Sequence, residues 1–278
     1  MIPFDFEYYK PETLDEAINL FNRLESDGKK PIYYGGGTEF ISMARMNNRY
    51  TEAVVDIKAI PECNIYKIIK NELVLGSAIT LTQIAEENLF PLLSMTVQRI
   101  ADHTIQGKIT LGGNLLGTII YKEALLPLLL SNSEILLANK DGKKRVSLDS
   151  ICNKGIQLEK GTMIVQVIIN KKFLSMPYLH MKRTKNEKID YPLLTIAALK
   201  DNDKISIAFS GLCEYPIRST QIEDILNDNS YSIDNRINKI IQNLPYELLN
   251  DISGSSEYRK FVLKGTLLEV FEKFGEVV

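Results

Sequence analysis

The stretch PIYYGGGTEF, residues 31–40, places three consecutive glycines between a β-favouring run and a polar pair. Isoleucine and tyrosine before the glycines predict a strand over residues 30–35. A turn rarely needs three glycines, which suggests that another group comes very close to this backbone. Glycine permits positive φ and removes the Cβ that would block such an approach. We therefore expect backbone N–H groups to be exposed between Tyr34 and Glu39, where they favour an anion, most obviously phosphate.

A second loop of the same kind lies in KITLGGNLLG, residues 108–117, where Gly112-Gly113-Asn114 follows a short β-like stretch. Neither loop has the GxGxxG or GxxxxGK[ST] pattern of the common nucleotide-binding motifs. Taken alone, each loop is also explained by a tight turn. The two loops together, with Thr38 and Asn114 as hydrogen-bonding side chains, favour one diphosphate held between two lobes.

Composition limits the remaining function classes. The chain has 278 residues, is 45% hydrophobic and 24% charged, and has a formal net charge of −2, so it is long enough for two domains and shows no basic surface for nucleic acid or anionic membranes. Three scattered cysteines and two histidines argue against disulfides, a zinc site or an iron–sulfur cluster held by this chain alone. The N-terminus lacks a signal-peptide pattern and no apolar run is long enough to cross a bilayer, which predicts a cytoplasmic protein.

Hydrophobic periodicity predicts a small α/β unit at the start of the chain. Residues 13–24 have a helical apolar face, with Thr13 as N-cap and Glu16 as its capping-box partner, and the helix is expected to end by Gly28. Strands are expected over 30–35 and 52–57.

The pattern after residue 65 predicts a second, mixed lobe and then a third region. The second lobe is expected to hold two strands joined at Lys70-Asn71, a capped helix from residue 81, a hairpin turning at Asp141-Gly142 and a strong strand over 162–170. Three more strands, two of them joined at residues 201–203, and helices from about residue 219 complete the chain. We place a domain boundary near residue 172.

Six segments resemble the FAD-binding subunit of molybdenum hydroxylases, the xanthine dehydrogenase and carbon monoxide dehydrogenase medium-chain family. Their order and spacing, which run almost end to end, make the resemblance specific. The segments are GGGTEF (35–40), VVDIKAIPE (54–62), TLGGNL (110–115), EALLPLLL (123–130), KIDYPLLTIAAL (188–199) and SSEYRKFVLKGTLLEVF (255–271).

The resemblance implies an α+β fold. A two-lobed FAD-binding domain of the vanillyl-alcohol oxidase-like (PCMH) type, residues 1–172 with lobes of about 1–57 and 58–172, would precede a smaller C-terminal domain of antiparallel sheet and helices, residues 173–278.

The resemblance also implies a set of cofactor-binding residues. The two glycine loops would hold the FAD diphosphate, Glu39 and Phe40 would continue the first loop along the cofactor, and Leu116 would touch the ring system. Glu123 would bind the ribose hydroxyls, and Lys182 would stabilise the reduced flavin. A helix-terminal acid and a solvated lysine are the ordinary alternatives for these two. The loop residues are Gly35, Gly36, Gly37, Thr38, Thr110, Gly112, Gly113 and Asn114.

Two departures from the family pattern concern the flavin environment. Ile105-Gln106-Gly107 replaces the usual Ile-Arg-Asn, and TIIYKEA (118–124) replaces a Pro-rich segment. The four-cysteine insertion of some relatives is missing.

By resemblance, the chain is an oxidoreductase subunit that binds FAD and contains no catalytic acid, base or nucleophile. Its expected partners are a molybdopterin-binding large subunit, a small subunit with two 2Fe-2S clusters, and NAD or another electron acceptor. Tyr191 is a candidate for screening the open face of the flavin, although core packing is the preferred explanation. A flavin-free assembly scaffold and a stand-alone FAD-dependent oxidase are the alternatives. The oxidase alternative is weakened because no His or Cys for flavin attachment lies near the glycine loops.

Overall fold

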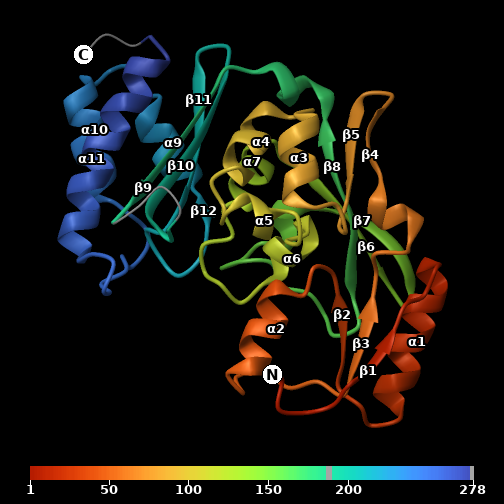
Figure 1. Ribbon diagram of the computed structural model, residues 1–278. Coiled ribbons are helices and arrows are strands. Elements are labelled where there is room, and N and C mark those ends of the chain that lie inside the picture. The colour runs from red at the N-terminus through yellow and green to blue at the C-terminus, as the bar shows by residue number, and fades with distance from the viewer. Residues whose placement is uncertain (186–189, 276–278) are drawn as a thin grey trace.

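The computed structural model, which describes residues 1–185 and 190–275, arranges the chain around a three-stranded, a five-stranded and a four-stranded sheet (Figure 1). The three-stranded sheet forms a first lobe near the N-terminus, and the five-stranded sheet with its helices forms a second lobe. The four-stranded sheet and the last helices form the C-terminal region. Within the described ranges, no helix has both the length and the apolar character needed to cross a bilayer.

The first lobe has parallel strands in the order β1-β3-β2, with a helix packed on each face. Successive residues of a strand point to opposite faces, so Ala53 and Val55 pack with helix α1 while Val54 packs with helix α2. The elements are β1 (Glu7–Tyr9), α1 (Leu14–Ser26), β2 (Pro31–Tyr34), α2 (Thr38–Arg45) and β3 (Ala53–Asp56).

Thr13 caps α1 as expected, because its hydroxyl accepts the N–H of Glu16 at 3.2 Å. The carboxylate of Glu16 accepts the N–H of Glu12 at 2.9 Å instead of that of Thr13. Only half of the predicted capping box therefore forms.

The second lobe has an antiparallel sheet in the order β4-β5-β8-β6-β7, and helices α3 to α7 lie between this sheet and the C-terminal sheet (Figure 1). Helix α7, with the sequence LLPLLL, is buried on all sides, because its leucines form part of the core of the second lobe. The elements are η1 (Pro61–Asn64), β4 (Tyr66–Ile69), β5 (Glu72–Gly76), α3 (Leu81–Glu87), α4 (Pro91–Val97), α5 (His103–Gln106), α6 (Leu111–Leu116), α7 (Leu125–Leu130), β6 (Glu134–Asn139), β7 (Gly142–Ser147), α8 (Leu148–Ile151) and β8 (Met163–Asn170).

The C-terminal sheet, in the order β12-β11-β10-β9, is covered on both faces. Ala197 and Leu199 of β10 join the core of the second lobe, while Ile196 and Ala198 pack toward the last three helices. The elements are η2 (Lys171–Ser175), β9 (Tyr178–Thr184), β10 (Pro192–Asp201), β11 (Lys204–Ser210), β12 (Ile217–Arg218), α9 (Thr220–Leu226), α10 (Ile233–Gln242) and α11 (Ser256–Lys273).

The strand pairs, the capped helix α3, the 141–142 hairpin and the late helices are confirmed as predicted. The boundary placed near residue 172 falls in η2, between the last strand of one sheet and the first strand of the next. Residues 188–189 of the segment KIDYPLLTIAAL lie outside the described residues.

Arg259 of α11 is fully buried and connects separate parts of the C-terminal region. Its guanidinium donates to the carbonyl oxygens of Leu193 at 2.5 Å, Gly211 at 2.6 Å and Leu249 at 3.1 Å. It also forms an ion pair with Asp251 at 2.7 Å. A buried guanidinium with this many acceptors leaves several groups unsatisfied when it is removed.

We predict that Arg259→Met lowers the free energy of unfolding by about 3 kcal/mol, because the carbonyls and Asp251 lose their donor while staying in place. The matched control, Arg183→Met, breaks a surface ion pair with Glu269 and should cost under about 1 kcal/mol. Chemical denaturation followed by circular dichroism measures both. Equal losses in the two variants would contradict the role given to Arg259.

Candidate functional site

The two glycine loops are in direct backbone contact. A Cβ on Gly36 would lie 1.6 Å from the carbonyl oxygen of Lys108, and a Cβ on Gly35 would lie 2.5 Å from Oγ1 of Thr110. No side chain fits at either position. The glycines are therefore required by the neighbouring loop, a reason that sequence analysis did not identify.

Gly37 has a different role. Its φ of +70° is left-handed, and a Cβ there would lie 2.0 Å from the hydroxyl of Tyr34. It is the N-cap of α2, and no side chain in residues 1–185 and 190–275 caps this helix. Among the described residues, no acceptor binds the N–H groups of residues 36–40, and the first bonded amide is that of Ile41, which donates to the Gly37 carbonyl. The N-terminus of α2 therefore presents free donors and the positive end of the helix dipole.

The second loop keeps its own N–H groups occupied. Gly112 donates to Ser77 O at 2.8 Å, Gly113 to Thr110 Oγ1 at 3.2 Å and Asn114 to Thr110 O at 2.9 Å. Gly113 is nevertheless exposed, and a Cβ built there would lie 3.0 Å from Thr110 Oγ1, the one contact found among the described residues outside its own helix and chain neighbours. Oδ1 of Asn114 is buried without a hydrogen-bond partner in the described part of the chain, as is Oγ of Ser77. What this loop offers a ligand is an open glycine and an amide side chain.

Glu39 joins the two loops. Its carboxylate accepts the Thr118 N–H at 2.8 and 2.9 Å, the Thr118 hydroxyl at 3.0 Å and the Ile119 N–H at 3.3 Å. A Cβ on Gly117 would lie 2.6 Å from the same carboxylate. The next residue, Phe40, packs in the core of the first lobe. Both side chains are thus engaged within the protein.

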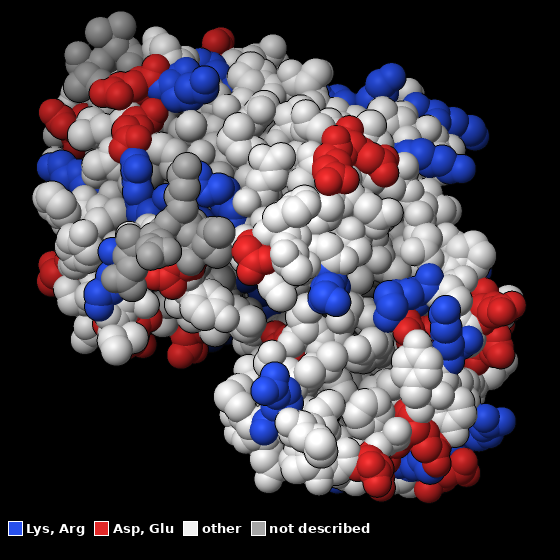
Figure 2. Space-filling model, in the orientation of Figure 1, with Lys and Arg blue, Asp and Glu red and all other residues white. Residues whose placement is uncertain are grey.

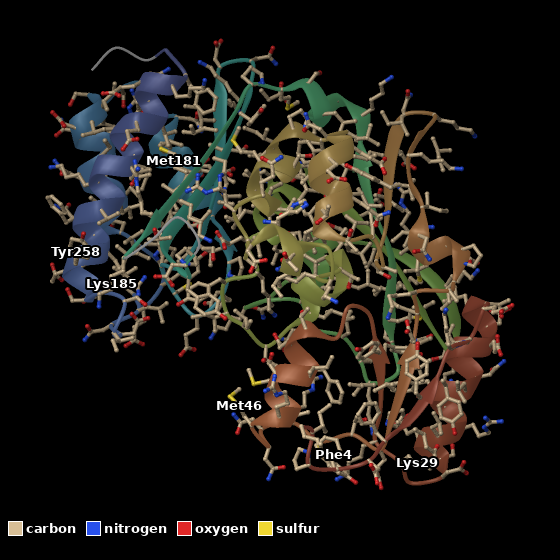
Figure 3. All side chains as sticks on the ribbon, viewed as in Figure 1. Phe4, Lys29, Met46, Met181, Lys185 and Tyr258 are labelled. Carbon is tan, nitrogen blue, oxygen red and sulfur yellow. The ribbon has the colours of Figure 1, made fainter. Side chains whose placement is uncertain are left out.

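Apolar side chains on the segments around the loops are partly open to solvent. Leu116 at the end of α6 is 41% exposed, and Ile41 of α2 and Ile119 are similarly open. Tyr191 stacks on Tyr121, with ring centroids 5.0 Å apart. Figure 2 shows acidic and basic side chains interspersed, and a surface indentation between the first lobe and the C-terminal region on the side of α2. Met46, directly after α2, marks the outer end of that helix (Figure 3).

Glu123 and Lys182 form a buried ion pair between the second lobe and β9. Lys182 Nζ lies 2.9 Å from Glu123 Oε2 and also donates to Arg99 O at 2.8 Å. Thr195 Oγ1 donates to the other carboxylate oxygen at 2.7 Å. Burial raises the pKa of the Glu123 carboxyl, against the opposing effect of the Lys182 ammonium. In this arrangement, the ion pair would have to open before Glu123 could bind the ribose hydroxyls or Lys182 could stabilise the reduced flavin.

Gln106 stands where relatives are expected to carry arginine. Its Nε2 donates to the carbonyl oxygens of Gln98, Ile100 and Ala101 at 3.0–3.2 Å. The Gln106 side chain is buried, and its hydrogen bonds hold residues 98–101 against the helix that precedes the second loop. Glutamine therefore has a structural role at this position.

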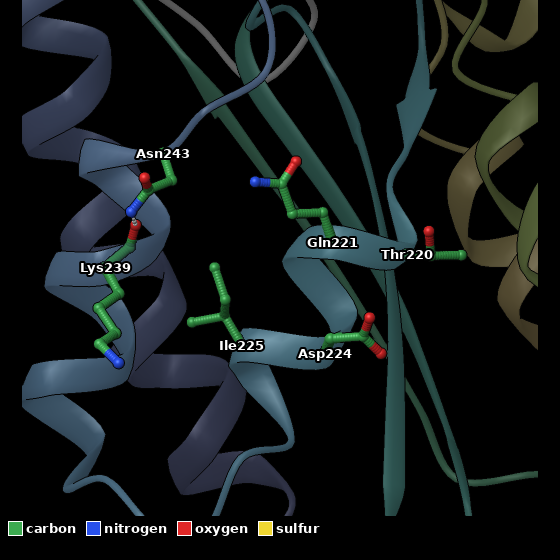
Figure 4. A pocket seen from close by; sticks show the side chains of 6 residues that line it. All are labelled: Thr220, Gln221, Asp224, Ile225, Lys239 and Asn243. Atoms are coloured by element: carbon green, nitrogen blue, oxygen red, sulfur yellow. Dashed lines mark hydrogen bonds between the residues drawn. The ribbon is translucent and has the colours of Figure 1, made fainter.

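An open surface pocket of about 500 Å³ lies between α9 and α10, in the C-terminal region (Figure 4). It is separate from the glycine loops. Its lining residues are Thr220, Gln221, Asp224, Ile225, Lys239 and Asn243. In the part of the chain that the structure describes, histidine, cysteine and acidic side chains do not gather into a group able to hold a metal ion.

His180 of β9 lies close to the buried ion pair. Its Nε2 has no hydrogen-bond partner among the described residues. Burial, with a smaller effect from the positive charges of Arg99 and Lys182, lowers the pKa of its imidazole to about 4. The folded chain therefore keeps His180 neutral.

We predict that the folded chain loses stability as pH falls from about 6.5 to 4. Unfolded His180 takes up a proton near pH 6.5 while the folded residue does not, which lowers the free energy of unfolding by up to about 3 kcal/mol across this interval. His180→Gln should flatten this decline in the thermal midpoint, whereas His103→Gln at the exposed histidine should not. The raised pKa of Glu123 acts in the opposite direction but is common to all three proteins. An unchanged slope in His180→Gln would contradict the prediction.

Comparison with known proteins agrees with this architecture. The chain is 22% identical to the nicotinate dehydrogenase FAD-subunit of Eubacterium barkeri over 80% of this chain and 79% of that protein. It is 29% identical to the carbon monoxide dehydrogenase medium chain of Hydrogenophaga pseudoflava over 41% of this chain and 40% of that one. A solved structure of carbon monoxide dehydrogenase from H. pseudoflava, lacking the Mo-pyranopterin moiety of its cofactor, superposes over the full length of both chains with a TM-score of 0.86 at 20% identity.

The solved structure supports the predicted α+β fold, a two-part FAD-binding domain followed by an antiparallel C-terminal domain. The family described as the FAD binding domain in molybdopterin dehydrogenase matches residues 4–171, which include both glycine loops. The match confirms the predicted family and cofactor. The chain belongs to the FAD-binding subunits of the molybdopterin dehydrogenases.

Proposed function

We propose that this chain is an electron-transfer subunit that holds FAD between its first two lobes. In this proposal it receives electrons from an iron–sulfur partner subunit and passes them to NAD or another acceptor. The observation that carries the proposal is the uncapped N-terminus of α2, whose amides are free where the two glycine loops meet. Such an end of a helix suits a diphosphate, because several N–H donors and the helix dipole act on the same negative charge.

The described residues fit the diphosphate in different ways. The N–H groups of Gly36, Gly37 and Thr38 have no acceptor among the described residues and can donate to a ligand. Gly113 is exposed on the second loop, and the side chain of Asn114 can donate through its Nδ2 to a phosphate oxygen. We assign diphosphate binding to these five residues.

Most of the other expected residues would support the site through packing and hydrogen bonds within the protein. Gly35 and Gly112 allow close packing, Thr110 caps α6, and Glu39 links the loops. Phe40 anchors α2 in the core. Leu116, being exposed at the end of α6, is suited to touch the flavin ring.

When bound, FAD supplies the conversion between single electrons and an electron pair. This chain would bind the cofactor, orient it and shield part of it from water. The relatives named as a nicotinate dehydrogenase FAD-subunit and a carbon monoxide dehydrogenase medium chain are parts of larger enzymes by their names. We infer a corresponding assembly here, with a molybdopterin-binding large subunit and a small subunit carrying two 2Fe-2S clusters.

The FAD site is tested at Gly113. Gly113→Val places a side chain on the exposed side of the second loop. Outside the backbone of its own helix, the contact given for the new Cβ among the described residues is with the hydroxyl oxygen of Thr110 at 3.0 Å, so the fold should survive. We predict at least a tenfold weaker affinity for FAD, about 1.4 kcal/mol, because the new side chain occupies the space proposed for the diphosphate. Fluorescence titration of the purified chain with FAD measures the change.

The matched control is Gly265→Val, on α11. Outside its own helix, a Cβ at Gly265 meets no described atom within 4 Å, and this glycine lies in the C-terminal region. Its affinity for FAD should equal that of the parent, with unchanged circular dichroism in both variants. Equal FAD affinity in Gly113→Val and the parent would argue against the proposed position of the diphosphate.

A further inference from the structure

Lys58, in the segment after β3, contacts the first glycine loop directly. Its Nζ donates to the carbonyl oxygen of Gly35 at 2.8 Å and to Asp56 Oδ2 at 2.7 Å. It also lies over the ring of Tyr34, 4.7 Å from the centroid. The side chain is 41% exposed, so a lysine with access to solvent is held at one orientation by three neighbours.

Asp56 fixes the lysine in turn. This carboxylate is almost fully buried at the end of β3 and accepts the Lys58 N–H at 2.9 Å through its other oxygen. It also accepts the hydroxyl of Tyr8 at 2.5 Å, and that hydrogen bond raises the pKa of Tyr8 to about 12. Asp56 is therefore tied to β1, to its own loop and to Lys58 at once.

The contact with Lys58 goes together with one orientation of the Gly35–Gly36 peptide group. A trans peptide is planar, and its C=O and N–H point in opposite directions. The described chain has no cis peptide bond. Because the Gly35 carbonyl points at Lys58, the N–H of Gly36 points away from Lys58, and no acceptor in the described chain binds it.

A peptide between two glycines has little intrinsic preference for this orientation, since glycine tolerates both signs of φ. If the peptide between Gly35 and Gly36 rotated by about 180°, the Gly35 carbonyl oxygen would face the position that the Gly36 N–H faces now. An anion at that position would then be repelled. An external contact that fixes the carbonyl therefore has a direct effect on anion binding.

We propose that Lys58 is a positioning residue for the diphosphate of FAD: it holds the Gly35 carbonyl so that the Gly36 N–H faces the anion. This inference rests on the FAD site proposed above. It assigns a function to the lysine of the segment VVDIKAIPE, residues 54–62.

The test compares FAD affinity in four variants of the full chain, each titrated by fluorescence. Lys58→Met keeps the length of the side chain but cannot hold the carbonyl, and Lys58→Arg restores a donor. Asp56→Asn keeps the shape of the side chain but removes the ion pair that orients Lys58. The matched control is Lys260→Met on α11, whose lysine is 38% exposed and forms an ion pair at 2.8 Å.

The expected result is at least about tenfold weaker FAD binding in Lys58→Met, recovery of most of that loss in Lys58→Arg, and parental affinity in Lys260→Met. Asp56→Asn should also weaken binding. If Lys58 acted only through its charge, removing the negative charge of Asp56 would instead strengthen FAD binding, and that outcome would overturn the positioning role. Circular dichroism and thermal midpoints of the unliganded variants show whether the fold is retained.

Failure of the two proposals can be told apart. If the parent chain does not bind FAD, the proposed FAD site is wrong and the role of Lys58 falls with it. If the parent binds FAD and Lys58→Met binds equally well, only the role of Lys58 is wrong.

Discussion

The close approach of Gly36 to the carbonyl oxygen of Lys108 is the constraint on which the proposed site depends. With room for no Cβ at this point, the first lobe and the second lobe meet backbone to backbone. Helices α2 and α6 both start within a few residues of this contact, α2 at Thr38 and α6 at Leu111. Thr110 closes one of these helix ends, and the other is left open by Gly37. The proposed anion site rests on this difference between two neighbouring helices.

Polar contacts between the three parts hold this arrangement. Glu39 binds the amides after α6 and so joins the first two lobes. The buried pair of Glu123 and Lys182 joins the second lobe to the C-terminal sheet, and Ser210 adds a hydrogen bond to the carbonyl of Tyr121 at 2.6 Å. Breaking a buried pair leaves an uncompensated charge, which makes these contacts suited to fixing the relative positions of the three parts.

Local patterns were enough to predict most of the fold. Asp141-Gly142 indicated the turn of the β6–β7 hairpin, and a cap at Thr13 indicated the start of α1. The orientation of side chains across the lobes could not be predicted in this way, because it depends on contacts distant in sequence. The contact of Glu39 with Thr118 depends on how the first two lobes pack together, and the contact of Glu123 with Lys182 depends on how the second lobe packs against the C-terminal sheet. Lys58 was overlooked for the same reason, since its contact with Gly35 joins two strand ends.

The most direct test of the account is amide hydrogen exchange of the chain with and without FAD. The N–H groups of residues 36–40, which donate to no acceptor in the described chain, should exchange rapidly without FAD and become protected when it binds. The amides of Gly112 and Gly113, already bonded, should change much less. FAD binding that leaves residues 36–40 unprotected would contradict the central claim that the open end of α2 holds the diphosphate.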